Sequence, residues 1–203
     1  MYISEPLHLK DNMKISDHIY PTIGDNSDGC GVLIGNLFIT AAHVVEDNPF
    51  YLRIGEQLLI LKKEEALIYE YNPCENGGDI AIFKIDNYCS PIRLDNMYPQ
   101  KGMTLNCVWT EHIVETDSND IFSIKESYAI KKCDAVINEV EGNFFQCKTT
   151  DLLKPGSSGS PVVRGDRVVG FLHGGHPGQP ICVFQSSISI IDKLVSAGIN
   201  YAI

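Results

Sequence analysis

The most informative segment of this sequence is KPGSSGSPVV, residues 154–163. Glycines surround a group of serines here, and a β-prone pair of valines follows. A nucleophilic hydroxyl used in acyl transfer needs neighbouring N–H groups that turn toward the developing oxyanion, and glycine permits that conformation. Only Ser158 fits the frame Gly-x-Ser-Gly-x-Pro, in which Gly156, Gly159 and Pro161 are the fixed points. Taken alone, the segment also fits an ordinary turn before a strand.

Two earlier segments supply the groups that a reactive serine requires. In FITAAHVV, residues 38–45, His43 follows an apolar β-run, and in GGDIAIFKID, residues 77–86, Asp79 opens one. Each alone fits a structural role, as a packed histidine or a turn aspartate. A serine becomes nucleophilic at neutral pH when a base takes its proton, and the base needs a carboxylate to fix its tautomer. The order histidine, aspartate, serine therefore predicts one catalytic unit.

The remainder of the chain is a series of short β-prone runs that end at Gly, Asn, Asp or Pro. Two such pairs of runs flank Gly35-Asn36 and Gly165-Asp166, which predict tight hairpin turns. Only SSISIIDKLVSAG, residues 186–198, has helical periodicity, and Gly198 is expected to end that helix. This pattern predicts an all-β, antiparallel protein of paired barrels with a terminal helix.

The three segments resemble the triad blocks of the chymotrypsin-like (trypsin-like) serine proteases, particularly the HtrA-type and glutamyl-endopeptidase-type enzymes. The resemblance also includes VVGFLHGG, residues 168–175, and covers most of the chain from about residue 29. It implies two six-stranded antiparallel β-barrels with the active site between them, followed by a C-terminal helix. The expected divisions are an N-terminal extension at 1–22, an N-terminal β-barrel at 23–95, a C-terminal β-barrel at 96–186 and the helix at 187–203.

The resemblance also assigns roles to residues. It implies that His43 acts as general base and then as general acid, that Asp79 orients it, and that Ser158 forms the acyl-enzyme. The backbone N–H groups of Gly156 and Ser158 would form the oxyanion hole. The expected activity is that of a serine endopeptidase acting on a protein or peptide substrate, with no metal or other cofactor.

By the same resemblance, one set of residues would form the pocket for the side chain before the cut bond: Leu152, Leu172, His173, Gly174, Gly175 and Cys182. Leu152, Leu172 and Cys182 favour an apolar side chain, and Leu152 cannot pair with Lys or Arg. However, His173 lies one residue from where glutamate- and glutamine-cleaving members place a pocket histidine. A shift of one residue in register would favour Glu or Gln instead.

Two positions depart from the secreted members of the family. Ser157 stands before the nucleophile, where those enzymes carry an aspartate that pairs with a newly cut N-terminus. That activation route is therefore expected to be absent, so the full-length chain is either competent as made or regulated from outside. Cys30 fits one half of a disulfide that those enzymes form, but Val44 occupies the other half, so this bridge cannot form.

Composition limits the remaining alternatives. The chain of 203 residues is 44% hydrophobic and 21% charged, which excludes disorder and coiled coil, and its net charge of −10 argues against nucleic-acid binding. The first twenty residues lack a signal-peptide core, and no apolar run approaches the roughly 18 residues of a membrane span. We expect a cytoplasmic protein whose seven cysteines are reduced. A separate regulatory partner and a catalytically silent binding module with the same fold stay open.

Overall fold

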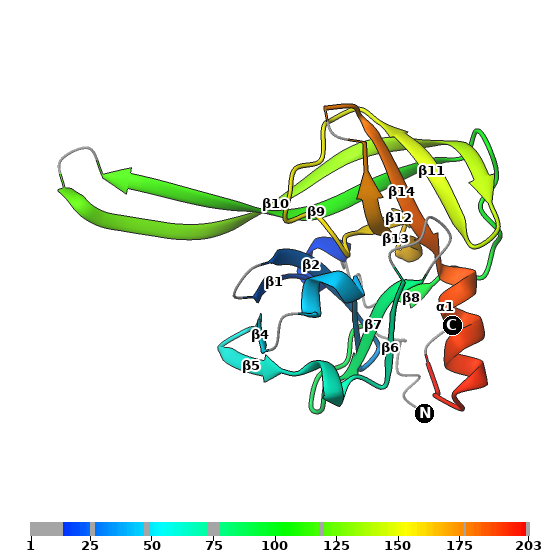
Figure 1. The fold of residues 1–203 in the computed structure, drawn as a ribbon, viewed down its shortest axis with the longest axis horizontal. Helices are drawn as coiled ribbons and strands as arrows, with labels where there is room; N and C mark the ends of the chain where they lie inside the picture. Colours follow the sequence, from blue (N-terminus) through cyan, green and yellow to red (C-terminus); the bar gives the residue numbers. More distant parts are fainter. Residues whose placement is uncertain are drawn as a thin grey trace, which may run out of the picture.

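The computed structural model describes residues 14–24, 27–46, 49–72, 78–117, 120–176 and 178–201, with only the backbone for residues 115–117 and 120–126. Its first half forms a seven-stranded antiparallel sheet in the order β5-β4-β1-β2-β3-β7-β6 (Figure 1). The strands are β1 (Ile19–Gly24), β2 (Asp28–Ile34), β3 (Leu37–Thr40), β4 (Phe50–Ile54), β5 (Gln57–Leu61), β6 (Ile68–Tyr71) and β7 (Asp79–Lys84). Short 3-10 turns occur at Ile15–His18, Ala42–Val45 and Lys63–Glu65.

The second half forms a closed barrel. Its strands are β8 (Arg93–Leu94), β9 (Thr104–Asp117), β10 (Asp120–Glu141), β11 (Phe144–Thr149), β12 (Pro161–Arg164), β13 (Arg167–Gly175) and β14 (Ile181–Ser186). Because β12 pairs with both β9 and β13, six strands close into a ring, and β8 joins β13 in parallel outside it. The predicted all-β double-barrel class is confirmed, although among the described residues the first sheet is an open half-barrel of seven strands.

Both predicted hairpin turns are present. Ile34 pairs with Leu37 across the first turn, and Arg164 pairs with Arg167 across the second. The leading glycine of each turn has a positive φ, 55° at Gly35 and 66° at Gly165, which a residue with a Cβ adopts at a cost. Local turn chemistry thus sets the register of the strands on either side.

Three apolar clusters form, because central strands such as β2, β3 and β7 bury side chains on both faces. One fills the first sheet around Phe38 and Phe83, and a second fills the C-terminal barrel around Phe145 and Phe184. The third lies between the two units and includes Ile39, Ile82, Val168 and Phe171 from their strands and Ile190 and Leu194 from the helix. This third cluster holds the two units against each other, and the helix covers it.

Helix α1 (Ser187–Ser196) forms where helical periodicity begins. The side chain of Ser186 caps it by accepting the N–H of Ile188 at 3.2 Å. Gly198, with a φ of 67°, lies just beyond its C-terminal end. There the N–H of Gly198 donates to the carbonyl of Val195, and the N–H of Ile199 donates to the carbonyl of Leu194. The helix thus ends two residues before the predicted glycine. None of the helices in the described part of the chain is long and apolar enough to span a membrane.

The elements do not divide quite where the sequence suggested. Strand β1 begins at Ile19, inside the segment 1–22 that was expected to be an extension, and it pairs with β2 and β4. In the second unit, β9 and β10 continue past the barrel as a long two-stranded arm (Figure 1). We define the arm as residues 108–117 and 120–134. It is the part of the fold that composition and periodicity did not anticipate.

Candidate active site

His43 sits in the 3-10 turn Ala42–Val45, directly after β3. Its neighbours Ala42, Val44 and Val45 are completely buried in the core of the first sheet, so the turn is anchored and the imidazole is left partly exposed. The backbone N–H of His43 donates to Oδ1 of Asp79 at 2.9 Å. The small residues before the histidine therefore let the turn pack closely while its ring faces a cavity.

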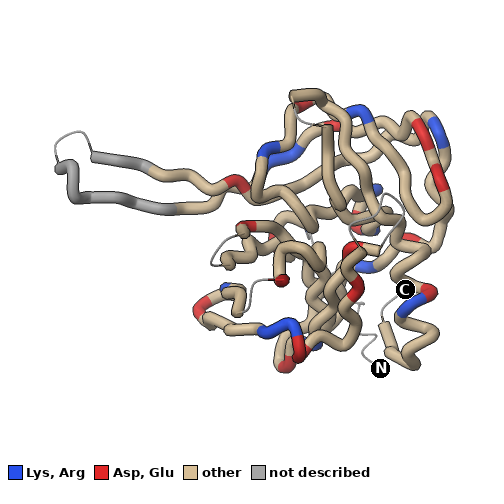
Figure 2. The backbone as a smooth tube through the Cα atoms, in the orientation of Figure 1, with Lys and Arg blue, Asp and Glu red and all other residues tan. Residues whose placement is uncertain are grey.

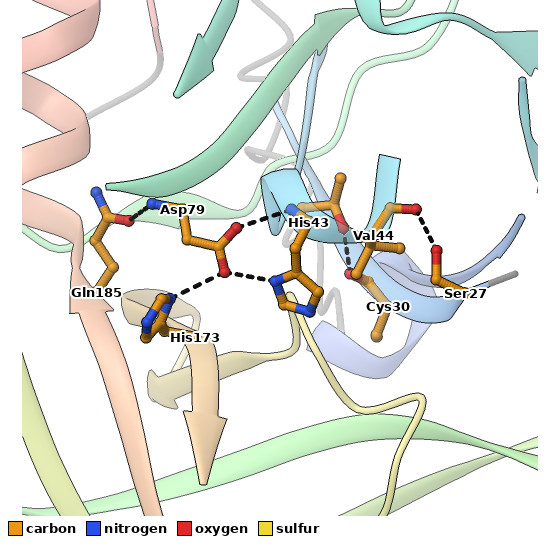
Figure 3. Close-up of polar contacts among 8 residues, drawn as sticks. Ser27, Cys30, His43, Val44, Asp79, His173 and Gln185 are labelled. Carbon is orange, nitrogen blue, oxygen red and sulfur yellow. Dashed lines mark hydrogen bonds and ion pairs between the residues drawn. The ribbon is translucent and has the colours of Figure 1, made fainter. Parts of the chain in front are cut away.

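Asp79 is the first residue of β7 and is only 2% exposed. Its Oδ2 atom lies 2.6 Å from Nδ1 of His43 and 2.9 Å from Nδ1 of His173 (Figure 3). Its backbone N–H donates to Oε1 of the buried Gln185 at 3.0 Å. His43 comes from the first unit, whereas His173 and Gln185 come from the second, so this one residue is held from both sides of the interface.

These contacts determine the ionisation of the site. Burial raises the pKa of Asp79, but hydrogen bonds from His173 and His43 and the charge of His43 outweigh it, so the pKa lies well below its usual range. An ionised carboxylate only accepts hydrogen bonds, so both Nδ1 atoms must donate. A neutral His43 then carries its lone pair on Nε2, the state that a general base requires.

His173 is aimed at Asp79 by an irregularity in β13. Leu172 pairs with Phe184 and Gly174 with Val183, so His173 is an extra residue opposite consecutive positions of β14. Such a bulge redirects the side chain that it contains. The ring also contacts Phe144, with 5.5 Å between the ring centroids. The structure thus places His173 beside the carboxylate instead of in the pocket where the sequence analysis had put it.

Ser158 is the accessible serine of the three in its loop. Ser157 is 2% exposed and Ser160 is completely buried, whereas Ser158 is partly exposed. Ser158 and His43 line the same cavity of about 570 Å³. The carbonyl of Ser158 accepts the N–H of Cys30 at 2.8 Å, which fixes the loop to β2.

The residues before Ser158 form a tight turn. The N–H of Ser157 donates to the carbonyl of Lys154 at 3.2 Å, and the hydroxyl of Ser157 donates to the same oxygen at 2.7 Å. Pro155 and Gly156 occupy the central positions, and Gly156 has a φ of 89°, as the third residue of a type II turn requires. Types I and II differ by a flip of the central peptide, so this turn fixes the direction of the Gly156 N–H.

Ser158 also lines a second cavity, of about 370 Å³. Its lining includes five of the six predicted pocket residues: Leu152, Leu172, Gly174, Gly175 and Cys182. Burial raises the pKa of the Cys182 thiol, so it presents a small uncharged group. His176 also lines this cavity, whereas His173 is not among its described lining residues.

Sequence reasoning missed two contributors to the site. Gln185 lies on β14, 106 residues from Asp79 in the chain, and nothing local marks it as a partner of that residue. Likewise, consecutive residues from Trp109 to His112 at the base of the arm line the larger cavity. The contact of Gln185 and the position of the Trp109–His112 segment both depend on how strands distant in sequence are placed. As predicted, Cys30 does not face a second cysteine at position 44: it is a buried free thiol.

A double-barrel fold with a histidine, an aspartate and a serine at the interface of its two halves defines a class, the chymotrypsin-like serine proteases. The chain matches the trypsin family over residues 22–193, and it belongs to that family. No curated protein matches its sequence.

Solved structures share the fold at low sequence identity. The active form of the Rv3671c protease from M. tuberculosis is 14% identical, with a TM-score of 0.63 over 93% of this chain and 84% of that one. The scabies mite inactivated protease paralogue S-D1 is 15% identical, with a TM-score of 0.65 over 92% and 95%. A Glu endopeptidase is 15% identical, with a TM-score of 0.60 over 90% of each chain.

The close approach of Gly159 to β2 and β3 gives a first prediction. A Cβ on Gly159 would collide with the carbonyl oxygen of Cys30 and the backbone nitrogen of Ala41, whereas one on Gly165 would meet nothing within 4 Å. Both glycines have positive φ, at 82° and 66°, so the strain of that conformation is common to both. Gly159→Ala should lower the free energy of unfolding by about 1–3 kcal/mol more than Gly165→Ala in denaturant titrations. Equal losses would contradict this packing.

The second prediction concerns the hydrogen bond from His173 to Asp79. His173→Ala should reduce stability at pH 7 by about 1.5–3 kcal/mol, the range for hydrogen bonds to charged groups. Because the pKa of Asp79 is depressed in the folded state, this stabilisation is complete above the ordinary carboxyl range and is lost as the pH falls below about 4. Denaturant titrations should therefore show the two proteins converging in acid. An unchanged gap, or an equal loss in the exposed His176→Ala, would contradict the assignment.

Proposed function

We propose that this protein is a serine endopeptidase that hydrolyses peptide bonds of protein substrates through an acyl-enzyme. The observation that carries the proposal is the arrangement of Asp79, His43 and Ser158. An ionised carboxylate holds Nδ1 of His43, and its ring lines the same cavity as the one accessible serine of the loop. A base in the correct tautomer beside a hydroxyl is what nucleophilic catalysis by serine requires.

The proposed reaction follows from these positions. The hydroxyl of Ser158 attacks the carbonyl carbon while its proton passes to Nε2 of His43, and Asp79 stabilises the resulting imidazolium. The negative charge on the substrate oxygen is met by the N–H groups of Gly156 and Ser158, and the type II turn supports this role for Gly156. His43 then protonates the leaving amine, and water hydrolyses the ester by the reverse sequence.

We further propose that the chain needs no cleavage of its own N-terminal residues. In the secreted relatives, cleavage frees a new N-terminus, and this N-terminus activates the enzyme by pairing with an aspartate before the nucleophile. Here Ser157 braces the turn through its own hydroxyl and N–H, both of which bond the carbonyl of Lys154. The support for a competent full-length chain is that this turn is closed without an external ammonium group.

The preferred substrate is proposed to carry an apolar side chain before the cut bond, in preference to Glu or Gln. The smaller cavity has leucines at positions 152 and 172 and an uncharged thiol at Cys182. His173, the residue that would favour an acidic or amide side chain, has its Nδ1 on Asp79. The exposed His176 at the same cavity is the feature that supports the Glu/Gln alternative.

A catalytically silent binding module is the second candidate. One observation favours it: the fold is as similar to an inactivated protease paralogue of the scabies mite as to an active protease. Fold similarity at 15% identity does not distinguish an active protease from a silent module, whereas labelling by a covalent probe does.

The third prediction therefore tests for a reactive serine in the full-length chain. A fluorophosphonate should label the protein and be blocked by Ser158→Ala, whereas Ser160→Ala should keep the label because Ser160 is completely buried. Removing a nucleophile of this kind reduces turnover by roughly 10⁶, so peptidase activity should be abolished along with the label. A folded wild-type protein that ignores the probe would establish the silent module instead.

The fourth prediction concerns the side chain before the cut bond. A peptide library that varies this position should be cleaved best at Leu, Met or Phe, because burying an apolar side chain in an apolar pocket is favourable. Leu172→Ala should reduce that preference while leaving fluorophosphonate labelling in place. Preferential cleavage after Glu or Gln would assign the alternative, and cleavage after Arg or Lys would contradict both.

A further inference from the structure

Within the arm, β9 and β10 no longer pair with their neighbouring strands of the second barrel. Strand β9 pairs with β12 only at Asn106 and Cys107, and β10 pairs with β11 only from Ala135 to Glu141. Within the described chain, the arm strands therefore pair with each other and have no strand beyond them (Figure 1). A strand edge of this kind presents unpaired N–H and C=O groups that can bind another extended chain.

The edge of β9 lies along the larger cavity. Four consecutive residues, from Trp109 to His112, line it, together with Tyr128 on β10. Successive side chains of a strand point to opposite faces, so a cavity lined by consecutive residues borders the edge of the strand and not one face. Residues 27–29 of the first unit line the same cavity.

This cavity lies on the leaving-group side of the cut bond. The smaller cavity, with Leu172 and Cys182, takes the side chain before that bond. Ser158 borders both cavities, but His43, which protonates the leaving amine in the proposed reaction, lines only the larger one among the described residues. The chain that begins with the leaving amine is thus directed into the cavity along β9.

Charges at the base of the arm are paired with each other. The carboxylate of Glu111 lies 2.5 Å from Nζ of Lys154 and 3.4 Å from Nζ of Lys131. The hydrogen bond to Lys154 lowers the pKa of Glu111. These contacts join β9, β10 and the loop of the nucleophile, and charged residues of both signs are found there (Figure 2). These paired charges at the base of the arm therefore favour neither an acidic nor a basic ligand.

The exposed face of the arm is apolar where it continues from the cavity. The rings of His112 and Tyr128 are stacked, with 4.9 Å between centroids and 16° between planes. Val114 and Ile130 lie on the same face as these rings and are 54% and 42% exposed. A strand added to β9 would place every second side chain beside this apolar row.

We infer that the edge of β9 binds the substrate segment after the cut bond as an added strand, with apolar side chains against His112, Tyr128 and Val114. The inference rests on the proposed function and specifies its substrate: an extended polypeptide that continues several residues past the cut bond. A folded surface loop or a peptide that ends at the bond would lack this contact.

The test compares peptides with Ala-Ala-Leu before the cut bond and either Ala-amide or Ala-Val-Thr-Val-amide after it. In the wild type, kcat/KM should rise at least about tenfold with the longer segment, a gain of about 1.4 kcal/mol. The gain should be lost in His112→Ala/Tyr128→Ala, and in a shortened arm in which Asn-Gly replaces residues 112–128 between the paired Glu111 and Ala129. Val136→Ala/Val140→Ala, which truncates two β10 side chains that are each 42% exposed, is the matched control and should keep the gain.

Binding separates this inference from the proposed function. Fluorescein-labelled forms of both peptides are titrated into Ser158→Ala, alone and combined with each arm variant, and the longer peptide should bind about tenfold tighter only when the arm is intact. A cooperative thermal unfolding transition of each arm variant, followed by circular dichroism, excludes misfolding. If the chain is silent but the binding gain depends on the arm, the inference stands and the proposed function fails. No gain, or a gain kept by the shortened arm, would overturn the inference.

Discussion

The buried carboxylate of Asp79 is the interaction on which the arrangement of this site depends. A charged group with 2% exposure is stable only when it is fully hydrogen-bonded, and here the partners come from both units. Nδ1 of His43 donates to it from the first unit and Nδ1 of His173 donates to it from β13 of the second, while Gln185 on β14 accepts the backbone N–H of Asp79. The apolar cluster between the units supplies the attraction, whereas this residue fixes how they are aligned.

The loop around Ser158 depends on the same alignment. Ser158 bonds Cys30 of β2, and Gly159 lies so close to Cys30 and Ala41 that no side chain fits between them. The loop therefore belongs to the second barrel in sequence, where Gly159 and Ser160 bond Leu172, but it is also positioned by the first sheet. This loop in turn places the two cavities beside Ser158. Each cavity, and the arm that borders one of them, then lies on a defined side of the bond that would be cut.

Local signals were enough to predict much of this. Turn glycines predicted two hairpins, periodicity and Gly198 predicted the helix, and three motifs in order identified the family. What sequence could not give depends on pairing between distant strands. The family resemblance assigned His173 to the pocket, but the bulge opposite β14 turns it toward Asp79. The arm was equally hidden, because strand length does not reveal where neighbouring strands stop.

The shared carboxylate can be observed directly by nitrogen-15 NMR of the histidine rings at neutral pH. His43 and His173 should both carry a proton on Nδ1 with a downfield shift, and Asp79→Asn should change both rings together. An Nδ1 atom of His43 without a proton, or a His173 ring that does not respond to Asp79→Asn, would contradict a carboxylate shared by the two rings.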